Sequence, residues 1–578
     1  TLTTQTTTDD NTAVGYEALA SNTTGTQNTA VGAYALDANT TDSYNSALGY
    51  QALSANTTGE KNTAVGSFAL RDSTTSDNNT ALGSSALLVN TTGAQNVSVG
   101  ALSLTSNTTA SNNTALGHQA LTSNTTGANN TAIGFQALKD STDTHSCVSV
   151  GYKAAENATA NYTTALGDRS MAGATVTGEH NTALGHYTLY NLTSGTRNTG
   201  GGSNALASVS TGDDNTSLGY NALGANSTGS DNTAVGAYAL DANTTAGNNT
   251  ALGYNALTAN TTGADNTAVG QGALLTNSTG SYNVAVGDDA LRLNTGGENT
   301  AVGTDCLSDN TASKNTGVGY RALYENTTGH DAVAVGYESL KNNTTGLYNT
   351  AVGYQALETN TTGERNTAVG RNSLTANTGS YNTAVGMNAL ETNSTGNRNT
   401  GIGCRASVGN QSGDDNTAVG NDALFANTGS DNVAVGSLAL DANTTGDANT
   451  ALGKDSLTAN TTGAGNVAIG KGAMAAVTTG NEHVAVGKGA LAAVTTASES
   501  TAIGYNALAA LTTGVRNTAL GFRALDAATT SQNNTAVGYK SLFTITDSGP
   551  HNTAIGANCM LVATSARSNT AVGDGTLT

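Results

Sequence analysis

Large, rigid and reactive residues are scarce in this chain of 578 residues. It contains no Trp, 5 Phe, 4 Cys and a single Pro. With so few large apolar side chains, any hydrophobic core must be thin. The cysteines lie too far apart in the sequence to build a disulfide framework or a zinc site; they are Cys147, Cys306, Cys404 and Cys559.

Charge is also sparse, because only 11 % of the residues are Asp, Glu, Lys or Arg, and the formal net charge is −20. An acidic chain with few cations is a poor ligand for nucleic acid or for anionic membranes. No hydrophobic run is long enough to span a bilayer, so we expect no direct membrane insertion. We find no signal peptide and therefore expect a processed product or the visible part of a longer polypeptide.

What fills the chain is a short repeat. Asn-Thr-Ala-Val-Gly or a close variant stands at Asn11–Gly15, at Asn28–Gly32 and onward to Asn569–Gly573. It recurs roughly every 17 residues, in about 34 copies, and a repeat this short must stack on its neighbours to bury a face. Disordered tracts do not keep Val, Leu and Ile in register in this way. The sequence thus predicts one continuous array over residues 1–578.

One repeat, residues 11–27, predicts one coil of a solenoid. Asn-Thr-Ala-Val is short and β-branched and ends at a glycine, which is typical of a strand closed by a turn. Residues 16–20 form a second short segment, either a strand or a helical turn, and Asn-Thr-Thr-Gly is a turn. We therefore predict an all-β, parallel β-solenoid (β-roll), with two short strands per coil and coils stacked about 4.8 Å apart.

Alternation along the strand separates two faces. Asn11, Ala13 and Gly15 share one face, and Thr12 and Val14 share the other. Neither face carries a charged residue in any copy, which indicates burial on both sides. We expect Val14 and its equivalents to pack inside their own coil with Leu19, and the Ala13 row to let another chain approach closely.

The motif Asn-Thr-Ala-Val/Leu/Ile-Gly followed by Ala-Leu resembles the head repeats of YadA-like trimeric autotransporter adhesins. It is also similar to the repeat shafts of phage tail fibres. The resemblance implies a trimeric, left-handed β-roll. The family's head repeats are shorter than these coils, and the chain shows no coiled-coil stalk, anchor or chaperone domain. Together with the thin core and the charge-free strand, the resemblance predicts a homotrimer.

This pattern favours a structural or adhesive role, as the shaft of an extracellular fibre that is a cell-surface adhesin or a matrix fibre. The alternative is a phage tail-fibre shaft for host recognition. We expect the chain at a cell surface or on a virion, with a host-surface or glycan receptor as partner. Tyrosines directly after the strand glycine form a candidate contact stripe, unless they only pack between coils. They are Tyr16, Tyr50, Tyr152, Tyr220, Tyr254, Tyr320, Tyr337, Tyr354, Tyr505 and Tyr539.

We expect no enzyme, cofactor or metal site, since the histidines are scattered and paired carboxylates such as Asp213-Asp214 fall in or beside turns. A carbohydrate-active solenoid is less favoured because the acidic positions drift between turns. Ice binding is less favoured because the Thr12 row is expected to be buried. The repeated Asn-Thr-Thr fits the N-glycosylation pattern, but turn chemistry explains it.

Variation in repeat length falls in or beside the Thr-Thr-Gly turn, as at the shortened Asn294-Thr295-Gly296. We therefore predict that this turn is an exposed edge that accepts insertions and deletions. The stretch 140–202 is the most irregular, and Gly200-Gly201 replaces Ala-Val there. It predicts a local bend or bulge.

Overall fold

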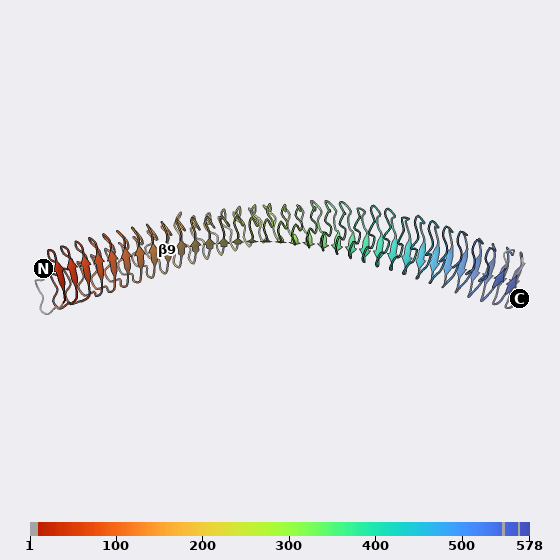
Figure 1. The fold of residues 1–578 in the computed structure, drawn as a ribbon, viewed down its shortest axis with the longest axis horizontal. Coiled ribbons are helices and arrows are strands. Elements are labelled where there is room, and N and C mark those ends of the chain that lie inside the picture. Colours follow the sequence, from red (N-terminus) through yellow and green to blue (C-terminus); the bar gives the residue numbers. More distant parts are fainter. Residues whose placement is uncertain (1–9, 546–548, 564–566, 578) are drawn as a thin grey trace. The chain divides into compact units, whose positions relative to one another are not determined.

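The structure is a computed structural model that describes residues 10–545, 549–563 and 567–577. It divides into two compact units, Thr1–Asp288 and Asp289–Thr578. Each unit is a stack of coils, and almost every coil contributes one strand of three residues (Figure 1). The chain is therefore an all-β repeat protein with about 17 residues per coil.

The strands of the first unit are β1 (Thr12–Val14), β2 (Thr29–Val31), β3 (Ser46–Leu48), β4 (Thr63–Val65), β5 (Thr80–Leu82), β6 (Val97–Val99), β7 (Thr114–Leu116), β8 (Thr131–Ile133), β9 (Val148–Val150), β10 (Thr164–Leu166), β11 (Thr182–Leu184), β12 (Thr199–Gly201), β13 (Thr216–Leu218), β14 (Thr233–Val235), β15 (Thr250–Leu252), β16 (Thr267–Val269) and β17 (Val284–Val286).

The strands of the second unit are β18 (Thr300–Val302), β19 (Thr316–Val318), β20 (Val333–Val335), β21 (Thr350–Val352), β22 (Thr367–Val369), β23 (Thr383–Val385), β24 (Thr400–Ile402), β25 (Thr417–Val419), β26 (Val433–Val435), β27 (Thr450–Leu452), β28 (Val467–Ile469), β29 (Val484–Val486), β30 (Thr501–Ile503), β31 (Thr518–Leu520), β32 (Thr535–Val537), β33 (Thr544–Ile545), β34 (Thr553–Ile555), β35 (Val562–Ala563) and β36 (Thr570–Val572).

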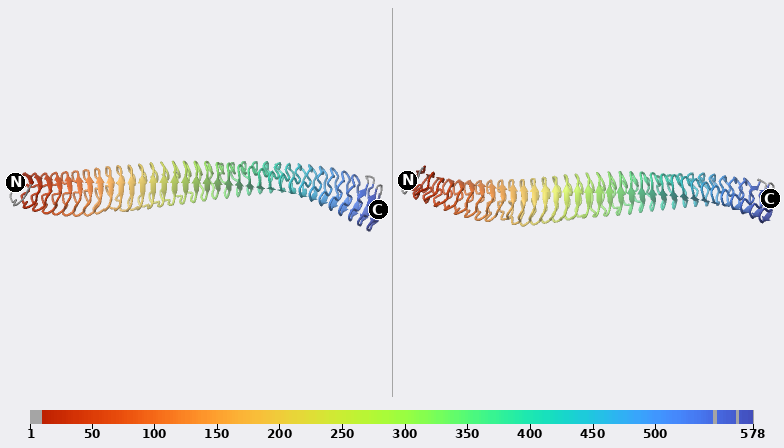
Figure 2. Two further views of the ribbon diagram at one scale, coloured as in Figure 1. Left: turned by 60° about the horizontal axis from the view of Figure 1, so that its bottom comes forward. Right: turned by 90° about the horizontal axis from the view of Figure 1, so that it is seen from below.

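Successive coils pair through parallel strands in strict register. In the first pair, Thr12 lies opposite Thr29, Ala13 opposite Ala30 and Val14 opposite Val31. Both views of Figure 2 show the strands of neighbouring coils side by side within each unit. Equivalent residues of successive repeats thus become nearest neighbours, and the predicted parallel β-solenoid is confirmed.

Of the two alternatives for the second segment of the coil, the strand is wrong. Residues 15–21 form consecutive turns, because Glu17 and Leu19 adopt positive φ angles of 53° and 55°. Equivalents of both positions repeat these angles along the chain, and a left-handed residue cannot continue an extended strand. In the described residues, a second pair of strands forms only between β33 and β35.

The two faces of the strand are also the reverse of the expectation. Ala30 and its equivalents are buried inside the coil with the Ala-Leu pair, such as Ala35 and Leu36. Val14 and its equivalents, expected inside, point outward, and so does the Thr12 row. The thin interior explains this outcome, because Leu36 already fills the space opposite the strand and leaves room only for a methyl group.

Two buried rows of asparagine complete the interior. In one row the backbone N–H of Asn45 donates to the Oδ1 atom of Asn28 at 2.9 Å, one coil earlier. In the other, the Nδ2 group of Asn39 donates to the Oδ1 atom of Asn22 at 2.9 Å and also to the carbonyl of Asp42. Each side chain therefore satisfies polar groups of two coils that would otherwise be buried without partners.

The Thr-Thr-Gly turn is only partly the exposed edge that we predicted. Thr24 is exposed, but Asn22 and Gly25 on either side of the threonines are buried. A shortened turn keeps the internal bond, since the Nδ2 group of Asn294 donates to the carbonyl of Gly296 at 2.7 Å. The turn therefore accepts a deletion because its asparagine still reaches the next glycine carbonyl.

The glycine that closes each strand is needed for stacking. Gly15 has a φ angle of 136°, and a Cβ atom there would lie 2.5 Å from the carbonyl oxygen of Gly32 in the next coil. The same close approach recurs along both units. Any side chain at this position would push two coils apart.

No bulge interrupts the strands in the irregular stretch 140–202. Strands β9 to β13 pair residue for residue in parallel register, so the predicted bulge is wrong. A Cβ atom on Gly200 would lie 2.5 Å from the Cγ2 atom of Thr188, which occupies the place of the usual Ala18-type residue. The glycine therefore makes room for a larger side chain one coil earlier.

Cys306 and Gly317 form a second pair of this kind. Cys306 is buried where most coils have alanine, as predicted, and burial raises the pKa of its thiol to about 12. A Cβ atom on Gly317 would lie 2.6 Å from the Sγ atom of Cys306. Gly317 replaces the alanine of the strand in the next coil, so the two substitutions keep the interior volume constant.

This pair predicts a non-additive effect on stability. Gly317→Ala overpacks the interior and should lower the free energy of unfolding by about 1–3 kcal/mol. In the Cys306→Ala background, Gly317→Ala recreates the common Ala/Ala arrangement and should be neutral or stabilising. Urea unfolding of the four proteins of this cycle measures the coupling. Equal effects of Gly317→Ala in both backgrounds would contradict the contact.

Candidate functional site

The most extensive surface feature is the outward face of the strands, here called the outer face. It has two rows. The first residue of each three-residue strand forms one row, which is mostly Thr with some Val and Ser46. The third residue forms the other row, which is Val, Leu or Ile except at Gly201. Leu48 and Leu82 are 49 % and 46 % exposed, whereas valines such as Val31 are half-buried. The outer face thus presents an apolar stripe along each unit, interrupted in the first unit at Gly201.

The threonine hydroxyls of the outer face make no hydrogen bond to any described residue. In this they differ from the threonine hydroxyls of the turn. In the turn, the Oγ1 group of Thr23 donates to the carbonyl of Thr40 at 2.8 Å, one coil later. Thr57 and Thr74 repeat this arrangement. The hydroxyls of the turn therefore hold successive coils together, whereas those of the outer face remain available to water or to another molecule.

All ten tyrosines of the predicted stripe are exposed, from 38 % at Tyr320 to 65 % at Tyr16. The structure brings some of them together with other aromatic rings. Three groups are stacked nearly parallel with centroids 5.2–5.6 Å apart; they are His118–Phe135–Tyr152, Tyr320–Tyr337–Tyr354 and Tyr505–Phe522–Tyr539. The rings of these three groups therefore pack between coils while remaining exposed to solvent.

Other tyrosines meet edge to face. Tyr238 lies one position further from the strand glycine than Tyr220 and Tyr254, and its ring stands at 79° and 82° to theirs. Tyr34 lies in the same way between Tyr16 and Tyr50. The parallel columns arise where three consecutive coils carry a ring at the same position, so the geometry follows directly from the repeat.

The asparagines of the Asn-Thr-Thr turns are structural. Asn22 is fully buried, and its Nδ2 group donates to the carbonyl of Gly25 at 3.0 Å. A glycan on this nitrogen would require the turn to open and the asparagine row to break. The buried position thus supports turn chemistry as the reason for the repeated sequon.

The paired carboxylates act as partners of turns and of arginine. Arg197 binds Asp214 through two hydrogen bonds of 2.6 and 2.7 Å, and this arginine lowers the pKa of the Asp214 carboxyl. Asp213 accepts the backbone N–H of Thr196 at 2.6 Å. Across the described ranges of the chain, no three His, Cys, Asp or Glu side chains gather in a way that could hold a metal ion.

His483 is a buried titratable residue that the sequence reading passed over as one of several scattered histidines. The signal was its place in the repeat, since it replaces the asparagine before the strand. The backbone N–H of Ser500 donates to its Nδ1 atom at 3.2 Å, and its Nε2 atom lies 2.6 Å from the carbonyl of Ala497. These partners require the neutral ring with its proton on Nε2.

Burial lowers the pKa of His483 below its usual range. None of the hydrogen-bond partners of His483 is a carboxylate that could balance the positive charge of a protonated ring. The flanking Glu482 and Glu499 are exposed to solvent. A second proton on Nδ1 would also point at the N–H of Ser500. Protonation therefore requires the local coil to open.

The stability of the coils around His483 should depend on pH. Because the folded state excludes a proton that the unfolded state binds with a pKa of about 6.5, stability is constant above that pH and falls as pH drops below it. Hydrogen exchange of amides in residues 466–500 at pH 7.5 and at pH 5.5, corrected for intrinsic rates, should show faster opening at the lower pH. His483→Asn restores the asparagine row and should remove this difference; if the difference persists in the variant, another group causes it.

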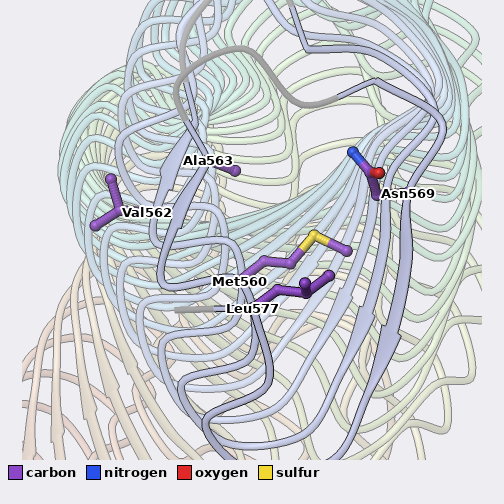
Figure 3. A pocket seen from close by; sticks show the side chains of 5 residues that line it. All are labelled: Met560, Val562, Ala563, Asn569 and Leu577. Atoms are coloured by element: carbon purple, nitrogen blue, oxygen red, sulfur yellow. The ribbon is translucent and has the colours of Figure 1, made fainter.

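A cavity of about 160 Å³ lies in the last coils and is lined by Met560, Val562, Ala563, Asn569 and Leu577. Figure 3 shows the side chains of Met560 and Leu577 extending next to each other. Only Asn569 contributes a polar side chain to this lining. The described lining of the cavity therefore brings together no group of convergent polar side chains of the kind that builds a catalytic site.

Comparison of the chain with protein-family models and with curated proteins found no match. Where the structure describes the chain, no helix is both long and apolar enough to cross a bilayer. The fold and its surfaces define the chain as a parallel β-solenoid repeat protein.

Proposed function

We propose that this chain is the shaft of an extracellular homotrimeric fibre, as in a cell-surface adhesin or a matrix fibre. The observation that carries the proposal is the apolar stripe of the outer face, which a single chain leaves in water. Monomeric proteins rarely expose continuous apolar patches of more than a few hundred Å². An aliphatic residue recurs on the outer face in nearly every coil of each unit, so its exposed side chains form an extended row rather than isolated apolar residues.

The chemistry of the outer face suits burial against identical chains. The strand segment contains no Asp, Glu, Lys or Arg in any copy, so close approach desolvates no charge. Copies of one chain carry the same repeat spacing, and their aliphatic rows can interlock coil by coil. Three copies are favoured by the resemblance of the repeat to trimeric adhesin heads. The interface differs from the expected one, because the Val14 row rather than the Ala13 row meets the partner.

The assembly can be tested by mass. Mass photometry of the full chain should give a species of about three chains of 57.2 kDa each. A stable folded monomer would contradict burial of the outer face. A dimer would support that burial but contradict the trimer.

Two adjacent substitutions separate the interior from the interface. Val235→Asp places a charge on the outer face and should weaken the assembly while leaving the fold of the coil intact. Ala234→Asp places the same charge inside the coil and should instead lower the melting temperature by disrupting β14 and its neighbours. Circular dichroism and mass photometry of both variants check this. The outer-face proposal fails if Val235→Asp disrupts folding as much as Ala234→Asp does.

A phage tail-fibre shaft that serves host recognition is the alternative within the same class. For both origins we propose contact with a host-surface or glycan receptor through many equal sites, whose effects add through effective concentration. The full chain and a version truncated to a third of its coils should differ sharply in avidity for host cells. Equal avidity, or no binding by either form, would assign recognition to another part of the fibre.

Ice binding is a second candidate because the Thr12 row, which we expected to be buried, faces solvent. Its hydroxyls recur in the register of a parallel sheet and are bonded to no other described residue. Thermal hysteresis of the full chain tests this function. Thermal hysteresis that is lost when the outer-face threonines are replaced would favour an ice-binding array. In that case no other chain covers the outer face.

A further inference from the structure

We propose that two aromatic columns bind flat, conjugated molecules that carry an anionic group. The first, here called the tyrosine column, consists of Tyr320, Tyr337 and Tyr354. The second, here called the mixed column, consists of Tyr505, Phe522 and Tyr539. This inference refines the contact stripe of the proposed function, and it does not depend on the number of chains in the fibre.

The stacking of the rings decides what they can bind. In the tyrosine column the planes of neighbouring rings differ by 23° and 7°, with centroids 5.4 and 5.2 Å apart. In the mixed column both angles are 10°. Each central ring thus has its two faces turned to its neighbours, and the column presents ring edges to solvent. Sugars stack on exposed ring faces, so these columns are poor platforms for glycans.

Ring edges carry positive partial charge, and ring faces carry negative partial charge. A flat conjugated molecule laid along the column places its face over the edges of three rings in succession. Edge-to-face packing is one of the two arrangements that aromatic pairs prefer. The rings are exposed by 38–48 %, so the column is open to such a ligand without a change of fold.

A cation extends each column by one coil in the same row. The guanidinium of Arg371 lies 5.8 Å from the ring centroid of Tyr354. The ammonium of Lys488 lies 5.8 Å from the ring centroid of Tyr505. Neither forms an ion pair with a carboxylate in the described part of the chain, so each is available to an anionic group at the end of the ligand.

Several other charges beside the tyrosine column are paired, but Glu358 in the coil of Tyr354 forms no ion pair with a described residue. Glu338 binds Lys341 at 2.8 Å, and Arg321 binds Asp305 at 3.1 Å. The column His118–Phe135–Tyr152 differs, because the arginine over its last ring, Arg169, donates a hydrogen bond to the hydroxyl of Tyr187. Two columns per chain therefore combine stacked rings with an available cation.

The test uses the full chain and two dyes of opposite charge. Congo red is a flat bis-sulfonate, and thioflavin T is a flat cation. Equilibrium dialysis should find about two saturable Congo red sites per chain. Tyr337→Ala should reduce this number to about one, whereas Tyr337→Phe should retain both. Arg371→Gln should weaken Congo red binding at one site several-fold and leave thioflavin T binding unchanged.

Tyr238→Ala is the matched control, because it removes the central ring of a three-ring group that stands edge to face. It should not change the number of Congo red sites. Equal loss in Tyr238→Ala and Tyr337→Ala, or no loss in either, would overturn the inference, as would glycan binding that depends on Tyr337. Mass photometry of the same samples reports the oligomeric state separately, so failure of the trimer and failure of the columns are distinguishable.

Discussion

Coil-on-coil contact in strict register is the constraint on which the rest of the structure depends. Each residue has as its nearest neighbour the equivalent residue one repeat away, so a side chain must be compatible with copies of itself. Gly15 and its equivalents satisfy this by having no side chain where the backbones touch. Asn28 and most of its equivalents satisfy it because the amide oxygen accepts the backbone N–H of the next coil while the Nδ2 group donates to a backbone carbonyl.

The same constraint produces the surfaces. A row of aliphatic side chains on the outer face forms a stripe that no single chain covers. A ring at the same position in three consecutive coils becomes a parallel column, whereas a ring displaced by one position, such as Tyr238, breaks the column into edge-to-face contacts. The position of a residue within the repeat therefore decides which surface feature it forms.

Much of the fold could be predicted from the sequence, because the period, the strand motif and the closing glycine are local signals. The pairing of Thr12 and Val14 on one face was also predictable. Which face points inward was not, because it depends on the volume that Leu36-type residues leave opposite the strand. The left-handed φ angles of Glu17 and Leu19 could not be predicted from the sequence either, because neither residue type favours them. The tyrosine stripe was visible in the sequence, but its division into columns and crossed rings required the geometry of consecutive coils.

The pair Cys306 and Gly317 has a consequence for how an array of this kind can change its length. Repeated genes gain and lose units by unequal exchange, and most coils here offer alanine to alanine at the junction. A junction that joins the coil of Cys306 to a coil with alanine in place of Gly317 crowds the Cys306 side chain, although the coil of Cys559 is followed by Ala571 in the next strand. Exchange of units at this junction is therefore less favourable than at an Ala/Ala junction, and the length of the array varies most freely where alanine meets alanine.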